Sequence, residues 1–180
     1  MGETRSFISI EFPSEIIKEV VRVQELLKNL KFTGKLTEQE NLHLTLKFLG
    51  NVEDEKLGLV KQRLSKIKFP EIKSSLGEIG TFSYRGMPRI VWIKVKGKVF
   101  ELQKEVDNSL KDLFKEEDRF MSHLTIARIK YVKNIKGFYE YLKNITVKHL
   151  PFSIEEFNLK SSELTPLGPK YENLESYRLL

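Results

Sequence analysis

Two copies of the tripeptide His-Leu-Thr, at residues 43–45 and 123–125, are the part of this chain best suited to chemistry. They hold two of its three histidines, and both stand in strand-like surroundings, HLTLKFLG and HLTIARIK. A neutral imidazole accepts a proton near neutral pH, and a protonated one donates a proton. Two such rings facing one phosphoester could open it by acid–base catalysis, while threonine hydroxyls donate hydrogen bonds to the phosphate oxygens.

Chance accounts easily for one His-x-Thr but poorly for two. Threonine makes up 8 of the 180 residues, so a given histidine has roughly a 4% chance of a threonine two positions later at ordinary composition. Two of three histidines doing so is about a half-percent event on the same basis. The candidate catalytic residues are therefore His43 and His123, with Thr45 and Thr125 as candidate phosphate-binding residues. His149 has no matching threonine, and we assign it no role.

Each motif is predicted to lie on a strand, over residues 42–48 and 120–129. Leucine and isoleucine alternate with polar residues there, so the motif histidines and threonines share the face opposite the apolar one. Lys47 falls on the histidine face by the same alternation and is expected to be a solvated surface lysine. The alternative for the pair is that both histidines are ordinary exposed strand residues.

The same order of elements is predicted twice along the chain: strand, helix, histidine strand, helix, strand. The predicted repeats span about 4–82 and 89–160, and a last strand runs toward residue 180. Repeated order plus a repeated motif predicts a single α+β domain of two pseudo-symmetric lobes, whose sheets meet across a central cleft. The alternative is that an unrelated α+β chain shows this order by chance.

Composition narrows the classes of protein. Apolar residues make up 40% and charged residues 31% of the chain, which is typical of a globular protein. The net charge of +6 favours a polyanionic partner such as RNA, although scattered lysines equally fit a solvated surface. The absence of cysteine removes thiol nucleophiles and disulfides, and it fits a cytoplasmic location. No apolar run approaches the roughly 20 residues of a membrane span, and the N-terminus lacks a signal-peptide core.

Other catalytic motifs are missing from the sequence. It contains no glycine-rich phosphate loop, no GK[ST] element and no HExxH helix. The motif histidines lie far apart along the chain, and nearby carboxylates lack metal-ligand spacing. We therefore expect a reaction that needs no metal and no other cofactor.

The paired motifs, together with the PRIVWIKV and SSELTPLGPKY segments, resemble the 2H phosphoesterase superfamily over nearly the whole chain. The similar branch is the 2'-5' RNA ligase type, also called RNA 2',3'-cyclic phosphodiesterase. The resemblance implies a bilobal α+β (LigT-like) fold with antiparallel sheets around a central cleft, and one lobe holding both chain ends. It also implies metal-free hydrolysis of a 2',3'-cyclic phosphate at an RNA 3' end to a 2'-phosphate, and reversible 2'-5' ligation.

The same resemblance implies roles for individual residues. One motif histidine protonates the departing 3' oxygen, which we place on His43, and the other activates water, which we place on His123. Phe48 and Arg128, each five residues after its histidine, would pack on the terminal base and contact the phosphate. Strict alternation would instead bury both side chains, so each strand must end or bulge before them. Core packing is the alternative for Phe48.

The expected partner is RNA with a 2',3'-cyclic phosphate end, tRNA fragments among the candidates. The protein is expected to be a monomer without membrane association. Two other functions stay open at this point. One is a phosphodiesterase acting on small nucleotides such as 2'-5' oligoadenylates, and the other is a non-catalytic module that binds RNA or nucleotides.

Overall fold

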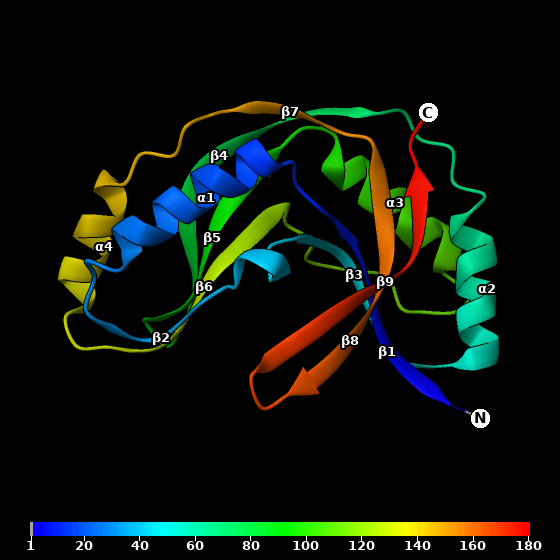
Figure 1. Cartoon of the computed structure of the whole chain (residues 1–180), viewed down its shortest axis with the longest axis horizontal. Helices are drawn as coiled ribbons and strands as arrows, with labels where there is room; N and C mark the ends of the chain where they lie inside the picture. The colour runs from blue at the N-terminus through cyan, green and yellow to red at the C-terminus, as the bar shows by residue number, and fades with distance from the viewer. Residues whose placement is uncertain (1) are drawn as a thin grey trace.

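The computed structural model describes residues 2–180 as two antiparallel sheets flanked by helices (Figure 1). The first sheet, in the order β3-β1-β8-β9, contains β1 (Glu3–Ile10), β3 (Leu44–Glu53), β8 (Glu156–Thr165) and β9 (Gly168–Arg178). The second, in the order β2-β6-β5-β4-β7, contains β2 (Phe32–Leu36), β4 (Ile72–Tyr84), β5 (Met87–Lys96), β6 (His123–Val132) and β7 (Pro151–Ile154). The helices are α1 (Ser14–Leu27), α2 (Asp54–Leu64), α3 (Val99–Leu110) and α4 (Ile135–Asn144).

The predicted α+β class with two antiparallel sheets is confirmed, and the two histidine strands lie in different sheets. In the first sheet β1 pairs with β3, and in the second β5 pairs with β6, so each half of the chain contributes a matching pair. Other strands cross over: β2 and β4 of the first half lie in the second sheet, where β4 pairs with β5, and β8 and β9 of the second half lie in the first sheet, where β8 pairs with β1. Neither predicted repeat therefore builds a sheet alone.

One helix of each half crosses over as well, α1 to the second sheet and α3 to the first. Figure 1 shows α2 and α3 beside the first sheet and α1 and α4 beside the second. Each helix buries an apolar stripe at helical spacing, as α1 does with Ile16, Val20, Val23 and Leu27. The buried residues of sheets and helices form one hydrophobic cluster. Within residues 2–180, no helix is both long and apolar enough to span a membrane.

Strand β2 is an element that the sequence pattern does not predict. Its residues, FTGKL, lack apolar alternation, and it forms the edge of the second sheet beside β6. A Cβ atom on Gly34 would lie only 2.2 Å from the carbonyl oxygen of Arg128. Glycine is therefore required there for β2 to approach the histidine strand.

Candidate active site

One cleft, of about 420 Å³, contains side chains from both histidine strands. Its lining includes all six candidate residues of the sequence analysis: His43, Thr45, Phe48, His123, Thr125 and Arg128. Strands β3 and β6 contact each other although they belong to different sheets, and the cleft lies beside them. Residues 80 positions apart in the sequence thus surround a space large enough for a small ligand.

Both histidine strands contain a β-bulge, three residues after the histidine. In β3, Thr45 and Lys47 pair with two consecutive residues of β1, so Leu46 between them has no pairing partner in β1. In β6, Thr125 and Ala127 pair with two consecutive residues of β5, so Ile126 between them has no pairing partner in β5. Each bulge adds one residue to its strand and so reverses the alternation that follows.

The bulges explain why Phe48 and Arg128 line the cleft. Each follows its bulge by two residues and therefore shares the face of its histidine. Phe48 is 67% exposed, so the alternative of core packing is wrong for it. The preceding residue of each strand turns inward instead: Lys47 is only 4% exposed and Ala127 is fully buried. The expectation of a solvated Lys47 is wrong for this reason.

A backbone carbonyl two residues upstream holds each imidazole in the same way. His43 Nδ1 lies 2.7 Å from the Asn41 oxygen, and His123 Nδ1 lies 2.6 Å from the Met121 oxygen. A carbonyl only accepts hydrogen bonds, so both Nδ1 atoms carry a hydrogen and donate it. Each neutral ring thus has its lone pair on Nε2, and Nε2 of His43 lies 3.0 Å from Thr45 Oγ1.

Aromatic rings bury the first histidine. The centroid of His43 lies 5.0 Å from that of Phe7 and 5.3 Å from that of Tyr171. This burial lowers the pKa of His43 to about 4, and the hydrogen bond to Asn41 opposes the shift only in part. The positive charge of Lys160 acts in the same direction as burial. His43 is therefore neutral near pH 7 in the free protein.

The second histidine has a similar setting built from different strands. The His123 centroid lies 5.0 Å from Phe82 of β4 and 6.5 Å from Trp92 of β5. Burial lowers its pKa as well, the Met121 carbonyl opposes the shift, and the charge of Arg128 adds to it. Both rings are thus poised to accept protons, and an anion in the cleft would favour protonation of either.

A buried glutamine of α1 holds the bulge of β6. Gln24 Nε2 donates to the Ile126 carbonyl at 2.9 Å and to the Thr37 carbonyl at 2.8 Å. Thr37 also reaches the histidine strand, because its hydroxyl donates to the Thr125 carbonyl at 3.1 Å. Gln24 therefore fixes the backbone from which Arg128 projects.

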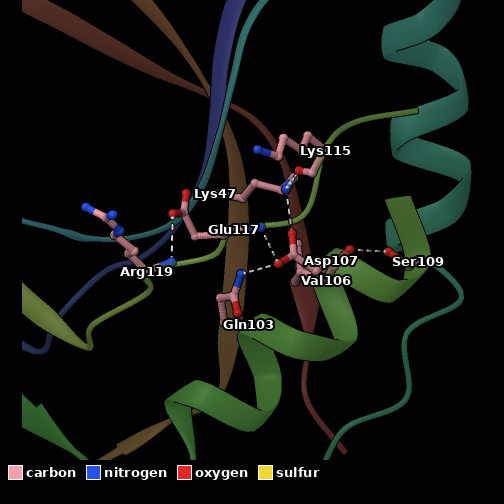
Figure 2. Close-up of polar contacts among 8 residues, drawn as sticks. All are labelled: Lys47, Gln103, Val106, Asp107, Ser109, Lys115, Glu117 and Arg119. Atoms are coloured by element: carbon pink, nitrogen blue, oxygen red, sulfur yellow. Dashed lines mark hydrogen bonds and ion pairs between the residues drawn. The ribbon is translucent and has the colours of Figure 1, made fainter. Parts of the chain in front are cut away.

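A buried ion pair holds the corresponding bulge of β3 in place (Figure 2). Lys47 Nζ donates to Asp107 of α3 at 2.5 Å, and the two side chains are 4% and 0% exposed. Asp107 also accepts from Gln103 Nε2 at 2.7 Å and from the Glu117 N–H at 3.0 Å, while Lys47 donates to the Lys115 carbonyl at 2.6 Å. We call these contacts the Lys47–Asp107 latch. It ties the segment after α3, which lines the cleft, to the first histidine strand.

His149 lies outside the cleft. Its Nδ1 donates to the Leu76 carbonyl at 2.7 Å, and the residue lines a separate surface pocket beside α4. Across residues 2–180, no group of three or more histidine, aspartate, glutamate or cysteine side chains is arranged to hold a metal ion.

Several residues of the cleft are not predicted by the sequence reasoning. Arg119 and Phe120 line it without belonging to any motif, and Tyr171 lines it at the end of the SSELTPLGPKY segment, where no residue has a predicted role. A signal does exist for the residues that hold the bulges: Gln24 and Asp107 are polar residues on the buried faces of amphipathic helices. A polar side chain at such a position needs a buried partner.

Comparison with known sequences identifies the family. The family model described as LigT like Phosphoesterase matches residues 10–92 and 94–171. The RNA 2',3'-cyclic phosphodiesterase of Methanocaldococcus jannaschii is 37% identical over 178 residues, covering 96% of this chain and 99% of that protein. The protein of the same name from Archaeoglobus fulgidus is 37% identical over 175 residues, covering 94% of this chain and 97% of that one.

Solved structures share the fold. TT0787 of Thermus thermophilus superposes with a TM-score of 0.83 at 24% identity, over 97% of both chains. Escherichia coli LigT in its apo form superposes with a TM-score of 0.78 at 22% identity, over 99% of both chains. Since the family model spans most of the sequence and the curated relatives match almost end to end, the chain belongs to the LigT-like phosphoesterase family of 2H phosphoesterases.

Proposed function

We propose that the protein hydrolyses the 2',3'-cyclic phosphate at an RNA 3' end to a 2'-phosphate by acid–base catalysis between two histidines. The observation that carries the proposal is the pair of matched imidazoles in one cleft, each with Nδ1 held by a carbonyl, so that Nε2 is the nitrogen that can exchange a proton with a ligand. The names of the relatives from M. jannaschii and A. fulgidus support the same substrate.

In the proposed mechanism, Nε2 of both rings does the chemistry because Nδ1 is engaged. His123 Nε2 accepts a proton from water as the water oxygen attacks phosphorus. The bond from phosphorus to O3' breaks, and His43 Nε2 donates a proton to the departing O3'. The product carries a 2'-phosphate and a free 3'-hydroxyl, and each ring ends in the protonation state in which the other began.

The other cleft residues would act on charge and position. We expect Thr45 and Thr125 to donate hydrogen bonds to the non-bridging oxygens, whose negative charge grows in the transition state. Arg128 adds a positive charge beside the same phosphate. The negative substrate also raises the pKa of the buried imidazoles, which supplies the protonated ring that catalysis requires. Phe48, exposed at the cleft edge, offers a face for the terminal base.

Hydrolysis and its rivals are separated by product analysis. The purified protein is given, in excess EDTA, an oligoribonucleotide with a 2',3'-cyclic end, a 2',3'-cyclic mononucleotide and a 2'-5' oligoadenylate. We expect conversion of the cyclic ends to 2'-phosphates alone, with the oligonucleotide preferred. A 3'-phosphate product, dependence on added metal, preference for the oligoadenylate, or tight binding without turnover would each contradict the proposal.

The assignment of acid and base has its own test. In a substrate whose bridging O3' is replaced by sulfur, the leaving group no longer needs a proton. We expect His43→Ala to recover most of its lost rate on this substrate and His123→Ala to recover none. The reverse pattern would exchange the two roles. Reversible 2'-5' ligation, a monomeric state and a cytoplasmic location stay predictions for ligation assays, light scattering and cell fractionation.

A further inference from the structure

One wall of the cleft continues outward onto the start of α3. Arg119 and Phe120 line the cleft, and the Phe120 ring lies 6.4 Å from that of Phe100, between centroids. Lys104 Nζ lies 5.7 Å from the centroid of Phe100. We call Phe100, Lys104, Arg119 and Phe120 the exit track. It combines two neighbouring aromatic rings with a positive charge beside each of them, the composition of surfaces that bind single-stranded nucleic acid.

Arg119 is the member of the exit track best suited to bind a phosphate. Its side chain is exposed, and within residues 2–180 its guanidinium makes no ion pair and no hydrogen bond. The neighbouring Glu117 carboxylate does not neutralise it but accepts from the Arg119 backbone N–H at 3.3 Å. Figure 2 shows the guanidinium pointing away from the Lys47–Asp107 latch. Arg119 is therefore available to an anionic ligand.

Phe100 is not needed for the core of the protein. The buried apolar stripe of α3 consists of Val99, Leu102, Val106 and Leu110. Phe100 lies off this stripe and is 51% exposed, with the Phe120 ring and the Lys104 ammonium beside it. Lys104, one turn later, shares its face. Ring and charge are thus presented together to the solvent.

The latch keeps this wall in place. Both members of the ion pair bind segment 115–117. The Lys115 carbonyl accepts a hydrogen bond from Lys47, and the Glu117 N–H donates one to Asp107. Ser122 closes the segment, because its hydroxyl donates to the Val95 carbonyl at 2.7 Å. A binding surface that is fixed in advance loses less entropy when a flexible strand binds to it.

The geometry points to the exit track as the binding site for the single-stranded RNA that immediately precedes the terminal nucleotide. Arg119 contacts a backbone phosphate there, Phe100 and Phe120 stack with bases, and Lys104 adds charge at the outer end. This inference rests on the proposed function, because the cyclic phosphate between the two histidines defines where the strand leaves the cleft.

The test compares substrates of two lengths. For each protein, kcat/KM is measured on an oligoadenylate with a 2',3'-cyclic end and on adenosine 2',3'-cyclic phosphate, and their ratio is taken. We expect Phe100→Ala and Arg119→Ala each to lower the ratio about tenfold, the size of one stacked base or one charged hydrogen bond. Arg119→Ala should also reduce the slope of log(kcat/KM) against log[salt] by about 0.7 on the oligonucleotide.

Matched controls come from surfaces outside the cleft. Tyr131→Ala removes an aromatic ring that is 55% exposed, and Arg178→Ala removes an exposed arginine; neither residue lines the cleft. Both controls should leave the ratio within about twofold of the wild type, since neither removes a contact to the strand. A wild type without preference for the oligonucleotide, an unchanged ratio in either track variant, or an equal fall in the controls would overturn the inference.

A binding measurement separates this inference from the proposed function. Fluorescence anisotropy is recorded with a labelled oligoadenylate that ends in a 2'-phosphate, so no turnover is needed. Phe100→Ala and Arg119→Ala should weaken this binding about tenfold, even if the wild type were found to hydrolyse neither substrate. Unchanged binding would overturn the exit track, whatever the outcome for hydrolysis.

Discussion

Removing one partner of the Lys47–Asp107 latch should destabilise the protein more than removing both. Lys47→Met leaves the Asp107 carboxylate buried with only Gln103 and the Glu117 N–H as partners, at a cost of about 3 kcal/mol, the lower end for a broken buried pair. Asp107→Asn leaves the buried Lys47 ammonium with neutral acceptors only, at a cost of about 3 to 4 kcal/mol. The double variant holds no unpaired charge, so we expect about 2 kcal/mol for its remaining unmatched polar groups.

Urea unfolding at pH 7, followed by circular dichroism, measures these free energies. The expected signature is a double variant several kcal/mol more stable than the sum of the single effects would allow. Asp112→Asn is the control, because it breaks the Arg63–Asp112 pair of α2 and α3, whose side chains are 39% and 52% exposed. That change should leave the unfolding free energy nearly unchanged, since solvent screens an exposed pair. Single costs below about 1 kcal/mol in the latch, well under the range for a broken buried pair, or additive effects in the double variant, would refute the reasoning.

The same latch should make the free energy of unfolding depend on pH in the acid range. Burial alone would raise the pKa of Asp107, but hydrogen bonds from Lys47, the Glu117 N–H and Gln103 outweigh it and hold the pKa below its ordinary range. The unfolded chain therefore binds a proton at higher pH than the folded protein does. The stabilisation is present above the unfolded pKa of about 3.9 and is lost as the pH falls through the folded value. Asp107→Asn should flatten the stability curve in that range.

Three further predictions concern the cleft. The pKa of His43 is about 4 and that of His123 lies below 6.5. The plot of kcat/KM against pH should therefore be bell-shaped, with its maximum on the acid side of about pH 6.5. A maximum above about pH 7.5 would contradict the assignment of both histidines to catalysis. Phe48→Ala should raise KM about tenfold, through the loss of one stacked base, with little change in unfolding free energy because Phe48 is exposed. Gln24→Leu should cost about 1 to 3 kcal/mol in urea unfolding and lower kcat, since it frees the bulge that orients Arg128; unchanged stability and rate would exclude this role.

The fold class and the cleft could be predicted because the relevant signals are local in the sequence. Alternation marks the strands, helical stripes mark α1 and α3, and the duplicated motif marks the two strands that meet. The exchange of β4 and β8 between the sheets could not be predicted in the same way. Pairing partners depend on long-range packing, and alternation is the same whichever sheet a strand joins.

The bulges mark the boundary of what alternation can predict. The sequence shows that Phe48 and Arg128 can reach the cleft only if each strand ends or bulges first, but it does not show which of the two happens, or where. The structure places the bulges at Leu46 and Ile126, where Lys47 turns inward to Asp107 and Gln24 binds the Ile126 carbonyl. These partners lie 60 and 102 positions away, beyond any local pattern.

The most direct test of the account is the turnover of a 2',3'-cyclic-ended oligonucleotide by His43→Ala, His123→Ala and the double variant. If both rings act on one phosphate, each single change should lower kcat by about 10² to 10⁴, and the double variant should be little slower than the singles. A single variant that keeps kcat within about tenfold of the wild type, with its fold intact, would contradict the claim that the two histidines share one reaction.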